Sequence, residues 1–413
     1  MARMFPGSVH QSFGNQALIF AVRAGAGMLV LVSALCLLIW NEVNVVAQHQ
    51  SLDSGKRHTV SFGVTMMNEI DPSREGTPVH ITGDAVAIKS AHDIVLGVTP
   101  SQALRLARHV EMYQWIEEVS SSSNDAGGTV FTYTQGWQTM LHPSDEFHDP
   151  EGHENPTAML FTSEQFVATP IQLGAYVLSN NDAIIQKFNW FEDMEEGVSV
   201  EHIPNETIRN RMQVYGSNGF YYGDDPSSPQ VGDLRITYQI VTSPQTVSII
   251  AAQVGNTLAP YQTFRSGYPI LLFERGSLSA FDMYDNAQGT IIFQAWKNRM
   301  VGILITFSAL LILAQPFLFV GTCIPLVRVI IGTADPCVML PIALMIEVVV
   351  IAITWLAYQP FLGLMLLAIV VGYFNNRLQE ARNAPTSEGY VVGNADESEA
   401  EEDEVEMPGL FKG

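Results

Sequence analysis

The stretch AGAGMLVLVSALCLLIW, from Ala24 to Trp40, contains no charged residue and decides the class of this protein. At a helical rise of about 1.5 Å per residue, about 20 apolar residues cross the hydrocarbon core of a bilayer. The run reaches that length as residues 17–40, because an arginine inside it can extend its charge toward the headgroups. Further apolar runs follow at 300–320, 338–358 and 359–374. The sequence therefore predicts an α-helical multipass membrane protein with four spans.

A cleavable signal peptide is the alternative interpretation of the first run. Arg3 and Arg23 supply positive charge, and Val45 to Ala47 resembles a weak cleavage site. However, the run is long for the apolar part of a signal peptide, and Trp40 followed by Asn41 is typical of a membrane interface. A retained anchor is therefore preferred.

Charge is distributed unevenly along the chain. Its 413 residues carry a formal net charge of −22, although only 15% are charged and 47% are hydrophobic. The block 41–297 holds a net charge of −17 and the segment 375–413 holds −7, after a short N-terminal tail at 1–16. This balance excludes a nucleic-acid binder, because phosphate neutralisation needs a surplus of lysine and arginine. The run DESEAEEDEVE at 396–406 is too charged to pack, which predicts a disordered acidic tail.

The cationic residues near the span ends predict the orientation. With four spans, five arginines fall on one side of the membrane: Arg3, Arg23, Arg328, Arg377 and Arg382. Because the positive side is cytosolic, the N- and C-termini are expected in the cytosol or nucleoplasm and the block 41–297 in the lumen. Lys297 and Arg299 lie on the other side and oppose this orientation. Asn205, in the sequon Asn205-Glu206-Thr207, supports it as a candidate glycosylation site.

The block 41–297 is predicted to be an α+β domain dominated by antiparallel sheet. Alternating side-chain character indicates strands at 108–117, 129–137, 234–240 and 247–254. Gly83-Asp84 is expected to form a turn. Between 163 and 196 the pattern shifts toward helix. The mixture places the domain in the α+β class.

Several motifs resemble one known family. RHVEMYQW at 108–115, GHENPTAM at 152–159 and VGDLR at 231–235 are similar to signature stretches of the transmembrane protein 43 (LUMA) family. Asn41-Glu42 after the first span is similar as well, although Val43-Asn44 stands where the family commonly has Gly-Arg. The residues that match the family motifs are Arg108, His109, Glu111, Tyr113, Trp115, Trp137, Gly152, His153, Asn155, Pro156, Gly232, Asp233, Arg235, Trp355, Tyr358 and Pro360.

The resemblance implies a function as well as a fold. It implies four spans, a large lumenal domain, self-association into a homo-oligomer, and residence among the lipids of the endoplasmic reticulum and nuclear inner membrane. It also implies emerin-like and lamin-type partners at the nuclear envelope. No cofactor is expected. The first functional hypothesis is therefore a multipass membrane scaffold that organises nuclear-envelope membrane-protein complexes through its lumenal domain and spans.

The segment HPSDEFHDPEGHEN, from His142 to Asn155, contains the densest group of polar side chains. His142, His148 and His153 with nearby carboxylates form a weak candidate metal site, since imidazole and carboxylate are common ligands. Proline and glycine make the segment a turn-rich loop, and loops of this kind collect polar residues without a metal. The interpretation without a metal is preferred.

His109 and Glu111 carry a second hypothesis, a membrane-associated enzyme or lipid-binding protein with a lumenal polar site. Together with Tyr113 they lie on one face of a predicted strand, where they could serve as acid and base. No nucleophile motif or phosphate-binding loop accompanies them, so structural hydrogen bonding is preferred and no catalytic residue is assigned.

Glu347 lies in the middle of the third predicted span and carries a third hypothesis. A carboxylate within the membrane is costly, so it suggests a small ion channel or transporter. A single ionisable group is thin support for a pathway. A role in helix association is preferred, with Thr306, Ser308 or a neighbouring subunit as partner.

Overall fold

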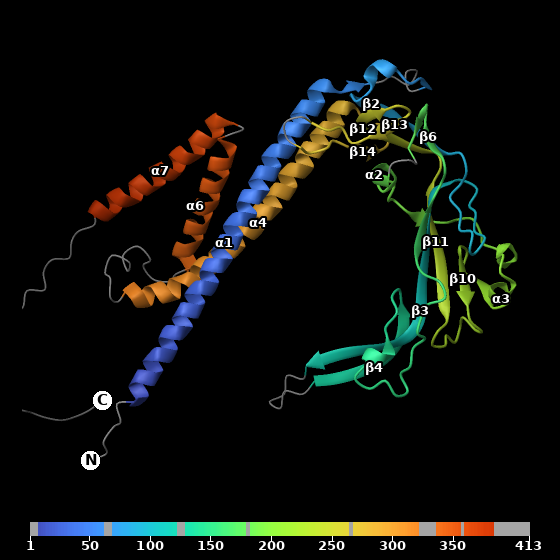
Figure 1. The fold of residues 1–413 in the computed structure, drawn as a ribbon, viewed down its shortest axis with the longest axis horizontal. Helices are drawn as coiled ribbons and strands as arrows, with labels where there is room; N and C mark the ends of the chain where they lie inside the picture. Colours follow the sequence, from blue (N-terminus) through green and yellow to red (C-terminus); the bar gives the residue numbers. More distant parts are fainter. Residues whose placement is uncertain are drawn as a thin grey trace, which may run out of the picture.

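The computed structural model describes residues 7–61, 68–121, 129–178, 182–263, 267–321, 336–356 and 359–383. Its long helices are α1 (Gly7–His58), α4 (Ala280–Gly321), α6 (Pro336–Trp355) and α7 (Pro360–Asn383). Figure 1 shows α1 and α4 side by side, with both β-sheets beyond one end of the pair, α6 against the other half of the pair, and α7 beside α6.

Two of these helices are long and apolar enough to cross a membrane. They lie within Leu18–His58 and Ala280–Ala314, whereas the apolar segments of α6 and α7, Met339–Trp355 and Pro360–Asn376, are shorter. A membrane protein carrying an α+β domain is therefore consistent with the structure. The prediction of two further spans rests on the shorter helices.

Helices α1 and α4 extend far past their predicted spans. Residues 41–58 of α1 and 280–299 of α4 form a paired extension, here called the stalk, within the block that was predicted to be entirely α+β. Leu52 on one helix and Tyr284 on the other are buried in it. In these segments the apolar residues lie only on the face that the two helices share. The mean hydropathy over consecutive residues is therefore low, and the predicted spans end before the helices do.

Small residues allow the two long helices to approach each other. A Cβ atom on Gly302 would overlap the side chain of Leu38, and one on Gly27 would lie 2.8 Å from Leu313 Cγ. Gly25, in the same AGAG run, has open space around it. Close packing of α1 on α4 therefore depends on particular glycines, as is common between membrane helices.

The first sheet packs against the end of the stalk. Its strand order is β13-β12-β2-β6-β7, with β1 beside β2 and β14 beside β12, and its pairs are antiparallel except β1 with β2. The bounds are β1 (Val60–Ser61), β2 (Pro78–Ala87), β6 (Ile171–Leu173), β7 (Tyr176–Val177), β12 (Gln245–Val254), β13 (Thr257–Ala259) and β14 (Leu272–Arg275).

The second sheet extends away from the first, and the β3–β4 pair forms its far end (Figure 1). Its order is β4-β3-β11-β10-β9, with β5 beside β3 and β8 beside β11. The bounds are β3 (Ala103–Ser121), β4 (Thr129–Gln138), β5 (Glu164–Val167), β8 (Glu192–Asp193), β9 (Met212–Tyr215), β10 (Gly219–Tyr222) and β11 (Leu234–Thr242). The remaining elements are short helical turns: Pro72–Arg74, Ser144–Glu146, α2 (Asp182–Ile185), Val200–His202 and α3 (Glu206–Arg209).

The predicted strands are confirmed, and two local predictions are wrong. Gly83-Asp84 lies inside β2 rather than in a turn, because its backbone pairs with Thr246 and Val247 of β12. The segment 163–196 contains strands and loops, with helix only at α2. Ile184, Ile185, Phe188 and Phe191 have the spacing of one helix face in the sequence. In the structure they reach the same core from α2 and from the irregular segment that follows it.

The alternation in β3 has the predicted consequence. Val110 and Met112 face the shared core of the two sheets, whereas His109 is exposed and Glu111 is half-buried on the other face. At the other end of the chain, α7 continues through Asn383, so part of the predicted tail is helical; residues 384–413 lie outside the described part of the chain.

Candidate functional site

Glu42 is the centre of a buried polar cluster that joins three of the long helices. The residue lies on α1 and is fully buried. Arg299 of α4 donates to both of its carboxylate oxygens, from Nε and Nη2, each at 2.7 Å. Trp355, the last residue of α6, donates from Nε1 to Oε2 at 2.9 Å. A buried bidentate pair therefore links the helices at one level.

Two asparagines complete this cluster. Asn41 Nδ2 donates to Glu42 Oε1 at 3.0 Å, and Asn298 Nδ2 donates to Asn41 Oδ1 at 2.8 Å. We call Asn41, Glu42, Asn298, Arg299 and Trp355 the Glu42 cluster. Each carboxylate oxygen of Glu42 therefore accepts two hydrogen bonds, as a buried carboxylate requires.

The sequence flagged four members of the Glu42 cluster separately, did not single out Asn298, and missed their association. Asn41, Glu42 and Trp355 carried the family resemblance, and Arg299 counted against the predicted orientation. The pairing joins residues 257 positions apart for Arg299 and 313 apart for Trp355. The available signal was the opposite charge of Glu42 and Arg299. Glu42 directly follows the first predicted span and Arg299 directly precedes the second, so both lie on the same predicted side of the membrane.

Glu347 lies deeper in the helices and is also buried, with 4% of its surface exposed. Neither carboxylate oxygen has a hydrogen-bond partner within the described ranges, and the same holds for the hydroxyl of Thr306, which is fully buried. Ser308 donates instead to Leu304 O of its own helix at 2.8 Å. The predicted hydrogen bonds from Glu347 to Thr306 or Ser308 are therefore not formed.

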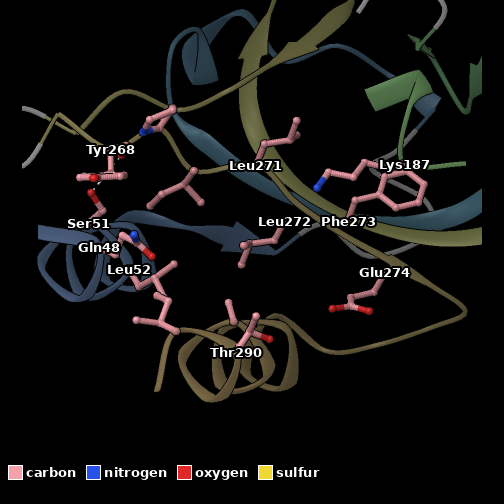
Figure 2. Close-up of a pocket in the computed structure, with 14 residues that line it drawn as sticks. Gln48, Ser51, Leu52, Lys187, Tyr268, Leu271, Leu272, Phe273, Glu274 and Thr290 are labelled. Atoms are coloured by element: carbon pink, nitrogen blue, oxygen red, sulfur yellow. Dashed lines mark hydrogen bonds between the residues drawn. The ribbon is translucent and has the colours of Figure 1, made fainter. Parts of the chain in front are cut away.

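A cavity of about 320 Å³ lies where the stalk meets the first sheet. Figure 2 shows Gln48, Ser51 and Leu52 of α1 on one side, Thr290 of α4 below, and Lys187 beside Phe273 on the opposite side. Its lining mixes apolar side chains with hydroxyl, amide and charged groups. Ser51 Oγ donates to Tyr268 O at 2.9 Å, so part of the polar lining is already used in holding the wall together.

The family-motif residues of β3, β4 and β11 converge on one face of the second sheet. Arg235 donates from Nε to Glu111 Oε2 at 2.5 Å, directly across the strand pair. Its guanidinium carbon lies 4.8 Å from the ring centre of Trp137, and the Trp137 and Tyr113 rings are 5.3 Å apart. The hydrogen bond with Glu111 raises the pKa of Arg235. These contacts are cross-strand pairs that stabilise the sheet.

His109 and Glu111 are engaged separately rather than as an acid–base pair. His109 Nε2 lies 3.1 Å from Gln239 Oε1, whereas Glu111 binds Arg235. Glu111 thus pairs with the residue directly opposite it on β11, whereas His109 reaches a diagonal neighbour, and both contacts support the structural interpretation.

Asn155 explains the GHENP motif. Its side chain accepts from Trp115 N at 2.7 Å and donates to Trp115 O at 2.9 Å, so it pairs with β3 as another strand would. Gly232 adopts a φ of 100°, which favours glycine, and donates to Tyr113 O at 2.8 Å. Pro156 lies beside it, 3.2 Å from where a Cβ would be. The GHENP and VGDLR motifs, which are distant in sequence, therefore contact each other and the same segment of β3.

Buried ion pairs and hydrogen bonds connect the middle strands of this sheet to the neighbouring segments. Arg108 donates to Asp93 at 2.6 Å and to Glu164 at 3.0 Å, and Tyr238 donates to Asp93 at 2.8 Å. Burial and the negative charge of Asp93 raise the pKa of Tyr238. Asp233 accepts from Tyr221 at 2.6 Å, and burial followed by that hydrogen bond raises the pKa of Tyr221.

Two of the three histidines of the candidate metal site stack on aromatic rings, and the third is held through its backbone. His148 stacks on Phe131 at 4.1 Å, and His153 stacks on Tyr133 at 3.9 Å. The carbonyl of His142 accepts from Asn155. Among the described residues, no group of three or more histidine, cysteine, aspartate or glutamate side chains converges.

The remaining predicted positions lie apart from these clusters. Asn205 is exposed at the start of α3, where its Oδ1 accepts from Ile208 N at 3.2 Å. Gly152 has a φ of 80° in an open turn, and Pro360 begins α7, a favourable position for proline. Tyr358 lies outside the described ranges.

Comparison with known proteins gives one consistent result. The family model described as "Transmembrane protein 43" matches residues 112–360, more than half of the chain. The chain is 26% identical to "Transmembrane protein 43" of Homo sapiens over 84% of its length and 86% of that protein's. It is 26% identical to "Transmembrane protein 43 homolog" of Drosophila melanogaster over 83% and 90%. No solved structure matches.

Proposed function

Because the chain belongs to the transmembrane protein 43 family, we propose that it is a four-span scaffold of the endoplasmic reticulum and nuclear inner membranes. In this role it organises nuclear-envelope membrane-protein complexes through its lumenal domain and spans, as a homo-oligomer. Its partners are emerin-like and lamin-type proteins, and both of its termini are cytosolic or nucleoplasmic.

The Glu42 cluster is the observation that carries this proposal. It ties α1, α4 and α6 together where the stalk begins, and α1 and α4 continue without interruption to the first sheet. A scaffold has to hold its membrane part and its binding surface in a fixed relation. Two continuous helices clamped by a buried ion pair supply such a connection.

The enzyme hypothesis has less support. His109 and Glu111 pair separately with Gln239 and Arg235, which leaves neither free to act on the other. A general acid or base must lie within hydrogen-bond reach of the proton that it transfers. Both side chains are engaged instead in cross-strand pairs of the kind that stabilise a sheet.

The Glu42 cluster gives Arg299 a structural role beside its effect on orientation. Arg299 opposes a lumenal block by its position, and its guanidinium donates to both oxygens of Glu42 inside the protein. The charge bias counts lysine and arginine whatever acidic residue lies beside them, so Arg299 and the exposed Lys297 still count against the proposed orientation.

A glycosylation assay tests the orientation. Asn205 is exposed, and the hydrogen bond that it accepts from Ile208 N uses Oδ1 rather than Nδ2, so a lumenal domain makes it a glycosylation acceptor. The full chain expressed in cells should show an endoglycosidase-sensitive mobility shift that is absent in Asn205→Gln. A sequon engineered into the 384–413 tail should stay unmodified. Modification of the tail instead of Asn205 would reverse the proposed topology.

Proximity labelling tests the scaffold role. A labelling enzyme fused to the full chain should enrich emerin-like inner-membrane proteins and lamins over a multipass protein confined to the endoplasmic reticulum. Arg299→Met, which breaks the Glu42 cluster, should reduce that enrichment, whereas Arg275→Met at an exposed ion pair should not. Equal labelling of both membrane compartments by the wild-type chain would contradict the proposal.

A further inference from the structure

Glu347 is a buried carboxylate that lies outside the Glu42 cluster. Its two oxygens are buried, and within the described residues nothing donates a hydrogen bond to them. The charges that act on it come from two helices packed against α6: Glu42 on α1 and Arg299 on α4. His49 of α1 lies farther along, with its ring 6.1 Å from that of Trp355.

Arg299 cannot serve as counter-ion to both carboxylates. It already donates to both oxygens of Glu42 at 2.7 Å, so the pair is neutral. An ionised Glu347 would add one uncompensated negative charge to the interior of the helices. Such a charge is strongly disfavoured unless a partner neutralises it.

Thr306 supplies the second unusual feature. Its hydroxyl is buried and does not bond to its own helix, unlike those of Ser308 and Thr354, which each donate to the carbonyl four residues earlier at 2.8 Å. Thr306 follows Arg299 by seven residues, about 10 Å along the helix, and Glu347 precedes Trp355 by eight, about 12 Å. Because Arg299 and Trp355 meet at Glu42, the two unpartnered groups lie at a similar depth on adjacent helices.

We propose that Glu347 is a proton-binding site, in which one proton converts its carboxylate to a carboxylic acid and the acid pairs with the Thr306 hydroxyl. The proton is taken up from a hydronium ion of the solvent, which leaves water, and it forms an O–H bond with one carboxylate oxygen. The net charge of Glu42, Arg299 and Glu347 changes from −1 to zero. The acid and the threonine each carry one O–H donor and have acceptor oxygens, so each can satisfy the other.

A metal cation fits the site less well than a proton. Sodium and calcium prefer a shell of several oxygen ligands. The site offers two carboxylate oxygens and one hydroxyl, while the neighbouring helical carbonyls are engaged in backbone hydrogen bonds. A proton needs one oxygen and one acceptor.

Infrared difference spectroscopy of the full chain in nanodiscs tests the proposal. At neutral pH the wild type should show a carboxylic-acid C=O band that shifts on deuteration and is absent in Glu347→Gln. Glu274→Gln, at a half-buried carboxylate of β14, should leave the band unchanged. Absence of the band from the wild type, or its persistence in Glu347→Gln, overturns the proposal.

Two further measurements separate the proton from other occupants. Replacing sodium and potassium by choline should leave the melting temperature of the wild type unchanged; a drop of several degrees that Glu347→Gln does not share would assign the site to a metal cation and overturn the proposal. Thr306→Val should keep the band but move its frequency. A band at the wild-type frequency would exclude Thr306 as the partner.

Discussion

Replacing Arg299 by methionine should destabilise the packing of the membrane helices severely. The substitution keeps much of the side-chain volume but leaves the fully buried Glu42 carboxylate without its counter-ion. Two hydrogen bonds of 2.7 Å are lost, and only Trp355 and Asn41 continue to donate to it. Removing one partner of a buried pair costs about 3–5 kcal/mol, which corresponds to more than about 100-fold in the folding equilibrium.

The measurement is unfolding of the purified full chain in bicelles with increasing denaturing detergent, followed by tryptophan fluorescence. Arg275→Met is the matched control, because Arg275 makes an ion pair with Glu192 at 3.5 Å between side chains that are 51% and 61% exposed. Such exposed pairs contribute about 0–1 kcal/mol. The double variant Glu42→Gln/Arg299→Met should be more stable than Arg299→Met alone, since it removes the unpaired charge.

Two outcomes would refute this reasoning. One is a loss for Arg299→Met no greater than that for Arg275→Met. The other is a double variant whose loss equals the sum of the two single losses, which would mean that Glu42 and Arg299 do not interact.

Three further predictions concern other parts of the fold. Gly302→Val should cost about 1–3 kcal/mol because the new side chain overlaps Leu38, whereas Gly25→Ala, in open space, should be nearly neutral in the same unfolding assay. Burial lowers the pKa of His80, so the folded chain binds a proton less readily than the unfolded chain. The contribution of His80 to the free energy of unfolding should therefore be complete above pH 6.5 and should fall at lower pH, by at most about 1.4 kcal/mol per pH unit. The variant His80→Gln should flatten this dependence. Asn155→Ala should cost about 1–3 kcal/mol through its lost bonds to β3, measured by protection of β3 amides from hydrogen exchange.

Each of these predictions has a result that would contradict it. Equal losses for the two glycine variants would mean that the helix approach is not limited by side-chain volume. A pH profile of His80→Gln that follows the wild type would assign the acid sensitivity to other groups. Unchanged exchange at β3 in Asn155→Ala would show that water replaces the asparagine without loss.

Much of the second sheet could be predicted from the sequence, because strand alternation is a local property. Val110 and Met112 face the core as the period of two requires, and His109 and Glu111 face outward. Gly83-Asp84 misled the prediction because glycine is permissive: it is common in turns, but nothing prevents it from pairing with Thr246 and Val247 in a strand.

The candidate site was predictable only in parts. Glu347 was recognisable from its depth in an apolar run, since any carboxylate there is exceptional. The lack of a hydrogen bond between Glu347 and Ser308 was not predictable, because a serine hydroxyl can bond either to another helix or to its own backbone. Ser308 donates to the backbone of its own helix. The histidine-rich loop shows the same limit: His148 and His153 are set apart by the rings on which they stack.

Apolar helices beside an acidic α+β domain can be recognised from the amino-acid order alone, because hydropathy and side-chain periodicity are properties of neighbouring residues. The association of Glu42, Arg299 and Trp355 and the continuation of α1 and α4 as a stalk became visible in the folded chain. A charge among packed helices is stable beside its partner, and which partner reaches it depends on how helices distant in sequence pack.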